Sequence, residues 1–261
     1  MPKTYVENYA KNKKHPKIRR FFNIILIVIV CVMVIMVGRL FSDILVGDLL
    51  FNAGSVKIEC STFYAICFGE FDSLDDAKKC AVWLENAGGA GYIFKSDKYL
   101  VFARTYDNES DAKKVIENIG TTIYDGSVKT FKTKSKKIKL KNCKKADKKN
   151  LLSCVNQLNN IVKSVADIDV SIDTNGLTNI GASNNLNSLK TNVGDIRLKL
   201  VELNKCYANI QINGLIAYCN MVLNEIDLAV NKLLVSTNET SVCKYLLTNL
   251  KFGYYSFVNN I

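Results

Sequence analysis

The sequence predicts an α+β protein that consists of one transmembrane helix, a β-α-β-β-α-β module and an all-α helical bundle. Three observations predict it: an apolar run at residues 21–38, two similar halves within 60–131, and apolar residues at helical spacing through 150–261. Of the 261 residues, 48% are hydrophobic and 23% are charged. This composition supplies enough apolar side chains for packed cores and argues against a disordered chain.

The first part is a basic tail, residues 1–20, followed by the apolar run. Residues 21–38 contain no charged side chain, and about 20 apolar residues span the hydrocarbon core of a bilayer. Arg39 can extend its charge to the headgroups, so we expect the helix to cover 21–42. A signal peptide would have a shorter apolar region and a small-residue cleavage site, and we find neither.

Basic residues before the span predict its orientation. Residues 1–20 hold seven Lys/Arg against Glu7, a net charge of +6. The positive-inside rule places this tail in the cytoplasm and everything after residue 42 outside it. We therefore expect a single-pass protein of the cell membrane with an extracytoplasmic C-terminus.

Catalytic groups are scarce in the extracytoplasmic part. His15 is the one histidine, which excludes Ser-His-Asp triads, Cys-His pairs and His-rich zinc sites after the span. The eight cysteines after the span include no C-x-x-C and fall on apolar faces, which favours free buried thiols. Glu59 and Glu70 show no spacing that predicts a catalytic pair. We expect no catalytic residue, no metal and no cofactor.

Residues 60–131 contain two similar halves. Each has an apolar strand that ends in an aromatic residue, then the sequence D-A-K-K at 76–79 or 111–114, then an apolar helix and a glycine. Two more β-prone segments, 91–94 and 127–131, complete a β-α-β-β-α-β order. This order predicts an antiparallel sheet with both helices on one face.

The module resembles the sporulation-related repeat (SPOR) domain. Tyr64–Phe71 reads Y-x-x-x-F-G-x-F, and Ala77, Leu84 and Gly88 follow at the family's spacing. The resemblance implies binding to peptidoglycan glycan strands stripped of stem peptides, on the exposed face of the sheet. It also implies a role in bacterial cell division or sporulation.

The resemblance also implies where the glycan would bind. The family's binding positions align with Cys67, Glu70, Lys98, Leu100 and Val128. Strand alternation adds Phe102 to the outer face beside Cys67 and Leu100. Such an apolar face is also typical of a packing or partner surface, covered by the C-terminal region or by a second copy of the chain. The alternative function is therefore a protein–protein scaffold or assembly factor of the envelope.

Residues 132–149 form a Lys-rich linker. Residues 125–149 hold eleven lysines against Asp125 and Asp147, a net charge of +9. The predicted topology places this segment outside the cell, so we expect no nucleic-acid partner. A solvated hinge is the favoured interpretation. Wall teichoic polymers or lipid headgroups as partners, and a short extra strand around Ile138 and Leu140, are alternatives.

Residues 150–261 predict the helical bundle. Apolar residues recur every three or four positions through 151–165, 186–210 and 215–233, and a fourth apolar stretch lies at 242–258. We expect a loop at 173–185, where glycine and asparagine gather. Four helices with short connections predict an antiparallel bundle. The same pattern also fits a self-associating coiled coil, which would make the chain a homo-oligomer.

Overall fold

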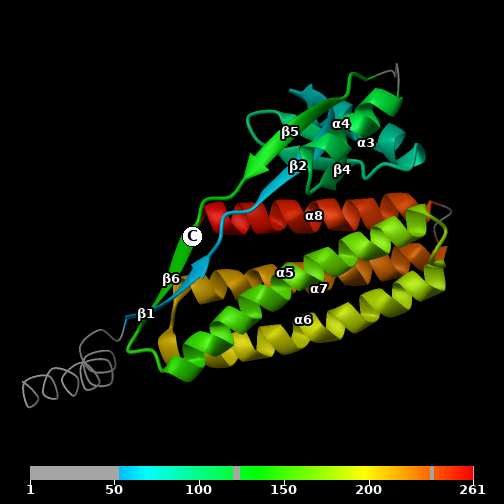
Figure 1. Cartoon of the computed structure of the whole chain (residues 1–261). Helices are drawn as coiled ribbons and strands as arrows, with labels where there is room; N and C mark the ends of the chain where they lie inside the picture. The colour runs from blue at the N-terminus through cyan, green and yellow to red at the C-terminus, as the bar shows by residue number, and fades with distance from the viewer. Residues whose placement is uncertain (1–52, 120–123, 236–237, 261) are drawn as a thin grey trace, which may run out of the picture. The chain divides into compact units, whose positions relative to one another are not determined.

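The computed structural model describes residues 53–119, 124–235 and 238–260 (Figure 1). The predicted tail at 1–20 and the predicted span at 21–42 lie outside these residues. Among the helices of the described part, none is long and apolar enough to cross a membrane. The elements follow in the order β1 (Ala53–Ile58), β2 (Thr62–Phe71), α3 (Leu74–Asn86), β3 (Tyr92–Lys95), β4 (Tyr99–Tyr106), α4 (Glu109–Ile119), β5 (Ser127–Lys132), β6 (Lys136–Lys141), α5 (Lys145–Asp173), α6 (Asn179–Tyr207), α7 (Ile210–Val235) and α8 (Glu239–Asn260).

Four strands form an antiparallel sheet in the order β3-β4-β2-β5. Side chains alternate along β2, so that Ile66 and Phe68 face α3 and α4 while Ala65 and Cys67 face the other side. The helices cover the first face with small and apolar residues. The core on that face consists of Ile66, Phe68, Ala77, Cys80, Ala81, Leu84, Val101, Ala103 and Ala112.

A second sheet contains two antiparallel strands, β1 and β6. Ile138 and Leu140 alternate with lysines along β6 and are buried, as are Val56 and Ile58 of β1. All four join the core of the helical region. The extra strand considered for the Lys-rich segment is therefore present, and it pairs with a strand near the start of the described chain.

Helices α5 to α8 form the helical region, in which α5 packs on α6 and α8, and α7 packs on α6 and α8. Helix α6 begins at Asn179, inside the predicted loop at 173–185, because the Thr178 hydroxyl caps it by accepting a hydrogen bond from the Gly181 N–H. The loop between α5 and α6 is thus shorter than predicted.

Helix α8 lies between the four-stranded sheet and helices α5 and α7 (Figure 1). Leu246 and Leu250 pack in the helical core, and Phe252 packs in the apolar cluster of the sheet's second face. A helix with apolar residues on several sides needs burial on several sides.

The predicted fold class, a β-α-β-β-α-β SPOR-like module after one transmembrane helix and then an all-α bundle, is wrong. Residues 53–261 form one compact mixed α/β unit, with two small antiparallel sheets and a region of four helices. The physical reason is that both faces of the larger sheet are apolar, so the second face packs on α8. Pairing of β1 with β6 ties the Lys-rich segment to the same unit.

Substitution of Phe252 by alanine tests this shared core. Phe252 is 0% exposed, and its ring centroid lies 4.7–5.3 Å from five other rings. We expect Phe252→Ala to lower the free energy of unfolding by about 3–5 kcal/mol. Urea unfolding followed by circular dichroism measures this loss.

Leu198→Ala on α6 is the control, because Leu198 is 58% exposed and its truncation should change stability by about 0.5 kcal/mol or less. We expect sheet and helices to unfold in a single transition. Two separate transitions in the unsubstituted chain, or equal losses in the two variants, would contradict the shared core.

Candidate functional site

The outer face of the four-stranded sheet, where the resemblance implies glycan binding, is covered by α8. Phe63, Ala65, Cys67, Phe102 and Phe252 form one buried cluster there. Aromatic side chains surround it, and Phe252 contacts Phe94, Phe102 and Phe131 at centroid distances of 4.7, 4.8 and 4.7 Å. This face is therefore a packing surface within the chain.

The structure does not bring the six predicted site residues onto one surface. Cys67 and Phe102 are 1% and 0% exposed beneath α8, and Leu100 packs against the same cluster. Val128 packs on the opposite face, in the core beneath α3 and α4. A glycan cannot reach Cys67 or Phe102 while α8 is in place.

The other two predicted site residues, Glu70 and Lys98, are exposed and paired with neighbours. Lys129 of β5 donates a hydrogen bond to Glu70, which holds the pKa of that carboxyl below its usual value. Lys98 lies 3.4 Å from Asp72. Both charges are thus compensated at the surface of the sheet.

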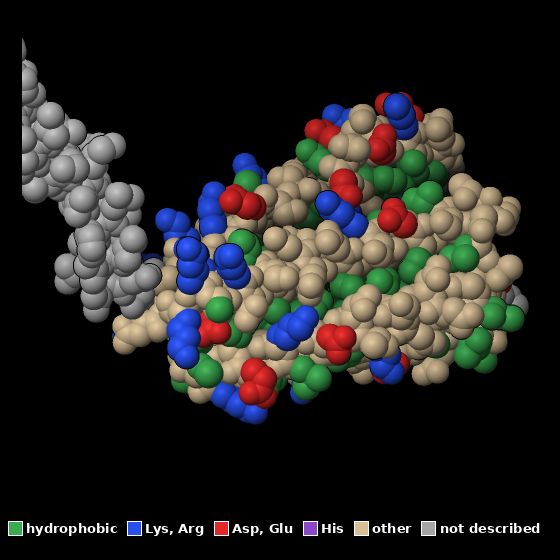
Figure 2. All heavy atoms as spheres, turned by 60° about the horizontal axis from the view of Figure 1, so that its bottom comes forward, with side chains coloured by type: hydrophobic (Ala, Val, Ile, Leu, Met, Phe, Trp, Pro, Cys, Tyr) green, Lys and Arg blue, Asp and Glu red, His purple; other side chains and the backbone are tan. Residues whose placement is uncertain are grey.

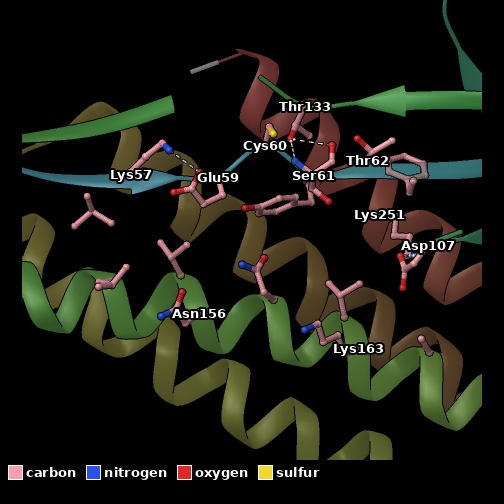
Figure 3. Close-up of a pocket in the computed structure, with 18 of the residues that line it drawn as sticks. Lys57, Glu59, Cys60, Ser61, Thr62, Asp107, Thr133, Asn156, Lys163 and Lys251 are labelled. Carbon is pink, nitrogen blue, oxygen red and sulfur yellow. Dashed lines mark hydrogen bonds and ion pairs between the residues drawn. The ribbon is translucent and has the colours of Figure 1, made fainter. Parts of the chain in front are cut away.

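A groove of about 720 Å³ lies beside this closed face (Figure 3). The β1–β2 segment forms one wall, one side of α5 forms the other, and Lys251 and Tyr254 of α8 also line the groove. Its size falls within the range of about 300–1,000 Å³ that is usual for ligand-binding sites. β1 packs on α5, and the groove lies beside this contact, between α5 and the chain that continues into β2.

Helix α5 supplies the groove with polar side chains at a spacing of three or four residues. Asn156 and Lys163 of α5 line the groove on the side opposite the β1–β2 segment (Figure 3). Within the part of the chain that the structure describes, the side chains of Asn156, Asn159 and Lys163 have no hydrogen-bond or ion-pair partner. They are available to a ligand, between apolar residues such as Leu152 and Val162.

The opposite wall and one end of the groove are already paired. Lys57 lies 2.7 Å from Glu59, and the Ser61 N–H donates to the Thr133 hydroxyl at 2.7 Å. Lys251 lies 2.6 Å from Asp107. The groove therefore has one wall whose polar groups already bond to each other, and a second wall, α5, with unpaired carboxamide and ammonium groups. These unpaired groups are available to bind a ligand.

The expectation of buried thiols holds for six of the eight cysteines after the predicted span, whereas Cys60 and Cys206 are exposed. Three of the buried thiols are poor nucleophiles. Burial raises the pKa of Cys80, Cys219 and Cys243 to about 12, so little thiolate exists at neutral pH. Among residues 53–119, 124–235 and 238–260, no group of His, Cys, Asp and Glu is placed to hold a metal ion.

A buried cluster of charges joins β4, α5 and α8. Arg104 lies 2.6 Å from Asp169 and also pairs with Asp173, and Lys244 lies 2.9 Å from Asp173. Asp169 is 0% exposed. Desolvation raises its pKa to about 6, against the opposing effect of Arg104. The cluster fixes how the sheet sits on the helices.

The sequence analysis did not identify Arg104, Asp169, Phe252 or the groove. Asp169 carried a signal, because it falls on the apolar side of α5 beside Ile168 and Ile172, where a charge requires a partner. No sequence pattern indicated the groove, because its two walls come together only in the tertiary structure.

Comparison with protein-family models, curated proteins and solved structures finds no match for the chain.

Asp169 predicts a pH dependence of stability. Its folded pKa of about 6 exceeds the ordinary value of 3.8, so the stability it contributes is fully present below about pH 4 and is lost as the pH rises through 6. We expect the unfolding free energy of the unsubstituted chain, relative to Asp169→Asn, to rise by about 2 kcal/mol from pH 7.5 to pH 4.

Urea unfolding of both proteins across this pH range measures the difference. Asp167→Asn, at an exposed position on the same helix, is the matched control and should follow the unsubstituted chain. Parallel curves for Asp169→Asn and the unsubstituted chain would show that Asp169 does not titrate in this window.

Proposed function

We propose that the chain is a non-catalytic, single-pass protein of the bacterial cell envelope that acts as a scaffold or assembly factor. The observation that carries this proposal is the burial of Phe252 in the outer face of the sheet. The predicted span at 21–42 would anchor the unit at the membrane, with its C-terminus outside the cytoplasm. Division or sporulation is the setting that the SPOR resemblance implies.

The covering of the sheet's outer face by α8 favours this function over glycan binding. A glycan on the sheet would have to displace α8 and expose the aromatic side chains of Phe63, Phe102 and Phe252. Each fully buried phenylalanine contributes about 1.5–3 kcal/mol, so displacement would cost several kcal/mol before any contact with sugar formed. The sheet face therefore serves the chain's own packing in this proposal.

The groove along α5 is the partner site in this proposal. Asn156, Asn159 and Lys163 offer free donors and acceptors, and Leu152 and Val162 offer apolar contacts. A partner segment with apolar side chains, backbone hydrogen-bonding groups and a carboxylate matches this lining. The two acidic side chains that line the groove, Glu59 and Asp107, are each paired with a lysine, which leaves no free carboxylate in the groove lining and supports a non-catalytic role.

Glycan binding is the second candidate. Residues 62–132 follow the strand and helix order β2-α3-β3-β4-α4-β5 that the resemblance implies. This candidate requires that α8 leave the sheet. The two candidates therefore differ in whether the C-terminal helix must move.

Sedimentation with peptidoglycan separates the two candidates. We expect the full chain in mild detergent to pellet no better with amidase-treated sacculi than with untreated sacculi, because α8 closes the sheet. Sacculi stripped of teichoic polymers and a high salt concentration remove attraction to the basic segments. Binding that rises with removal of stem peptides would contradict the scaffold proposal.

Cross-linking from the groove tests the partner site. A photoreactive residue at Asn156 in living cells should give one discrete adduct with an envelope protein, because this position faces the groove. The same residue at Leu198, exposed on α6, is the matched control and should give none. An adduct between two copies would instead identify a homo-oligomer, and equal products from both positions would exclude the groove.

A further inference from the structure

Exposed lysines gather at the end of the described unit that contains β1 and β6 (Figure 2). Because Ile138 and Leu140 face the core, strand alternation turns the lysines of β6 to the outside. Lys57 lies outward between two buried residues of β1 in the same way. We name this surface the lysine face, and it consists of Lys57, Lys137, Lys139, Lys141, Lys144, Lys145, Lys148 and Lys149.

The lysine face is poorly neutralised by the rest of the unit. Residues 53–59 and 133–149 contain two acidic side chains, Glu59 and Asp147. Glu59 pairs with Lys57, and Asp147 accepts a hydrogen bond from the Tyr207 hydroxyl at 2.6 Å. The ammonium groups of the other seven lysines of the face have no ion-pair or hydrogen-bond partner among the described residues.

Local electrostatics oppose this arrangement of lysines. Lys57 stands directly opposite Lys137 in the β1–β6 pairing, and like charges in that position are destabilising. Lys145, Lys148 and Lys149 lie in or next to the first turn of α5, where the helix dipole favours anions. The lysines thus lie at positions where their positive charge destabilises the folded unit. An external anionic surface would reduce this repulsion.

Strand pairing places the lysine face beside β1, the strand that follows the predicted membrane span in the sequence. Ala53 pairs with Lys141, and Gly54 pairs with Leu140. Only residues 43–52 separate β1 from the predicted span at 21–42. Ten residues reach at most about 35 Å when fully extended. The Ala53–Lys141 end of the face therefore cannot lie farther than this from the end of the span, although Lys141 is distant from the span in sequence.

We propose that the lysine face docks on anionic lipid headgroups of the membrane that holds the span. This inference rests on the membrane anchor of the proposed function. Each lysine near an anionic bilayer contributes about 1 kcal/mol, and the attraction falls off within about 10 Å. The ten-residue tether limits how far the face can move from the bilayer, whereas a wall polymer has no such link to it, which favours lipid as the occupant.

Lysine labelling in nanodiscs tests the docking. The full chain is placed in discs of phosphatidylcholine alone or with phosphatidylglycerol, and an amine-reactive reagent is read out by mass spectrometry. We expect labelling of Lys137, Lys139 and Lys141 to slow several-fold in the anionic discs and to recover at high salt. Lys78 and Lys113, on α3 and α4, should label equally in both.

A charge variant and its matched control sharpen the test. Lys137→Gln/Lys139→Gln/Lys141→Gln should return the labelling of Lys144 and Lys148 in anionic discs to the rate in neutral discs. Lys78→Gln/Lys79→Gln/Lys113→Gln removes the same charge elsewhere and should leave their protection unchanged. Equal labelling of the unsubstituted chain in both kinds of disc would overturn the proposal, whatever the variants do.

Two further arms separate the sources of failure. Protection by soluble polyglycerol phosphate in neutral discs, with none from anionic lipid, would assign the face to a wall polymer and overturn lipid docking. Extraction of the full chain from membranes by alkaline carbonate would contradict the proposed membrane span. It would also contradict the docking, which depends on that span. A chain that resists extraction but shows no protection would overturn the docking alone.

Discussion

The packing of α8 is the contact on which the rest of the structure depends. Leu246 and Leu250 complete the core of the helical region, while Phe252 fills the aromatic cluster on the sheet. Without α8, both apolar surfaces would face water. The buried pair of Arg104 and Asp169 lies at the same junction, and a buried charge without its partner is strongly destabilising. Apolar contacts thus supply the stability of the junction, and charges fix its geometry.

This packing determines where a ligand can bind. A sheet of this size usually leaves one face available, but here α3 and α4 cover one face and α8 covers the other. The accessible concave surface lies instead at the margin, where the β1–β2 segment passes over α5. The unpaired polar side chains there include Asn156, Asn159 and Lys163 of α5, while the larger sheet contributes Thr62 and Phe63 at the start of β2.

Sequence periodicity predicted most of the buried helix positions but not what they pack against, and Ile210, the last residue of the predicted series 186–210, is 82% exposed. Ala77, Cys80 and Leu84 are buried as their spacing predicts, and so are Leu186 and Leu200. The packing of α8 on the sheet and the pairing of Ala53 with Lys141 join segments far apart in sequence, and such contacts leave no local pattern. Strand alternation did predict an apolar outer face with Cys67 and Phe102, and cover by the C-terminal region was one of its interpretations. Spacing alone could not choose that interpretation or predict the fold class.

The lysine face and the groove share residues, which links the two proposals. Lys57 and Lys148 belong to the lysine face and also line the groove. If the face lies on lipid, this end of the groove opens at the membrane surface. A partner segment that enters from this end would itself have to lie close to the bilayer, as the segment next to a membrane anchor does. The geometry then selects membrane-anchored proteins over freely diffusing ones, which is the selectivity that a scaffold of the envelope requires.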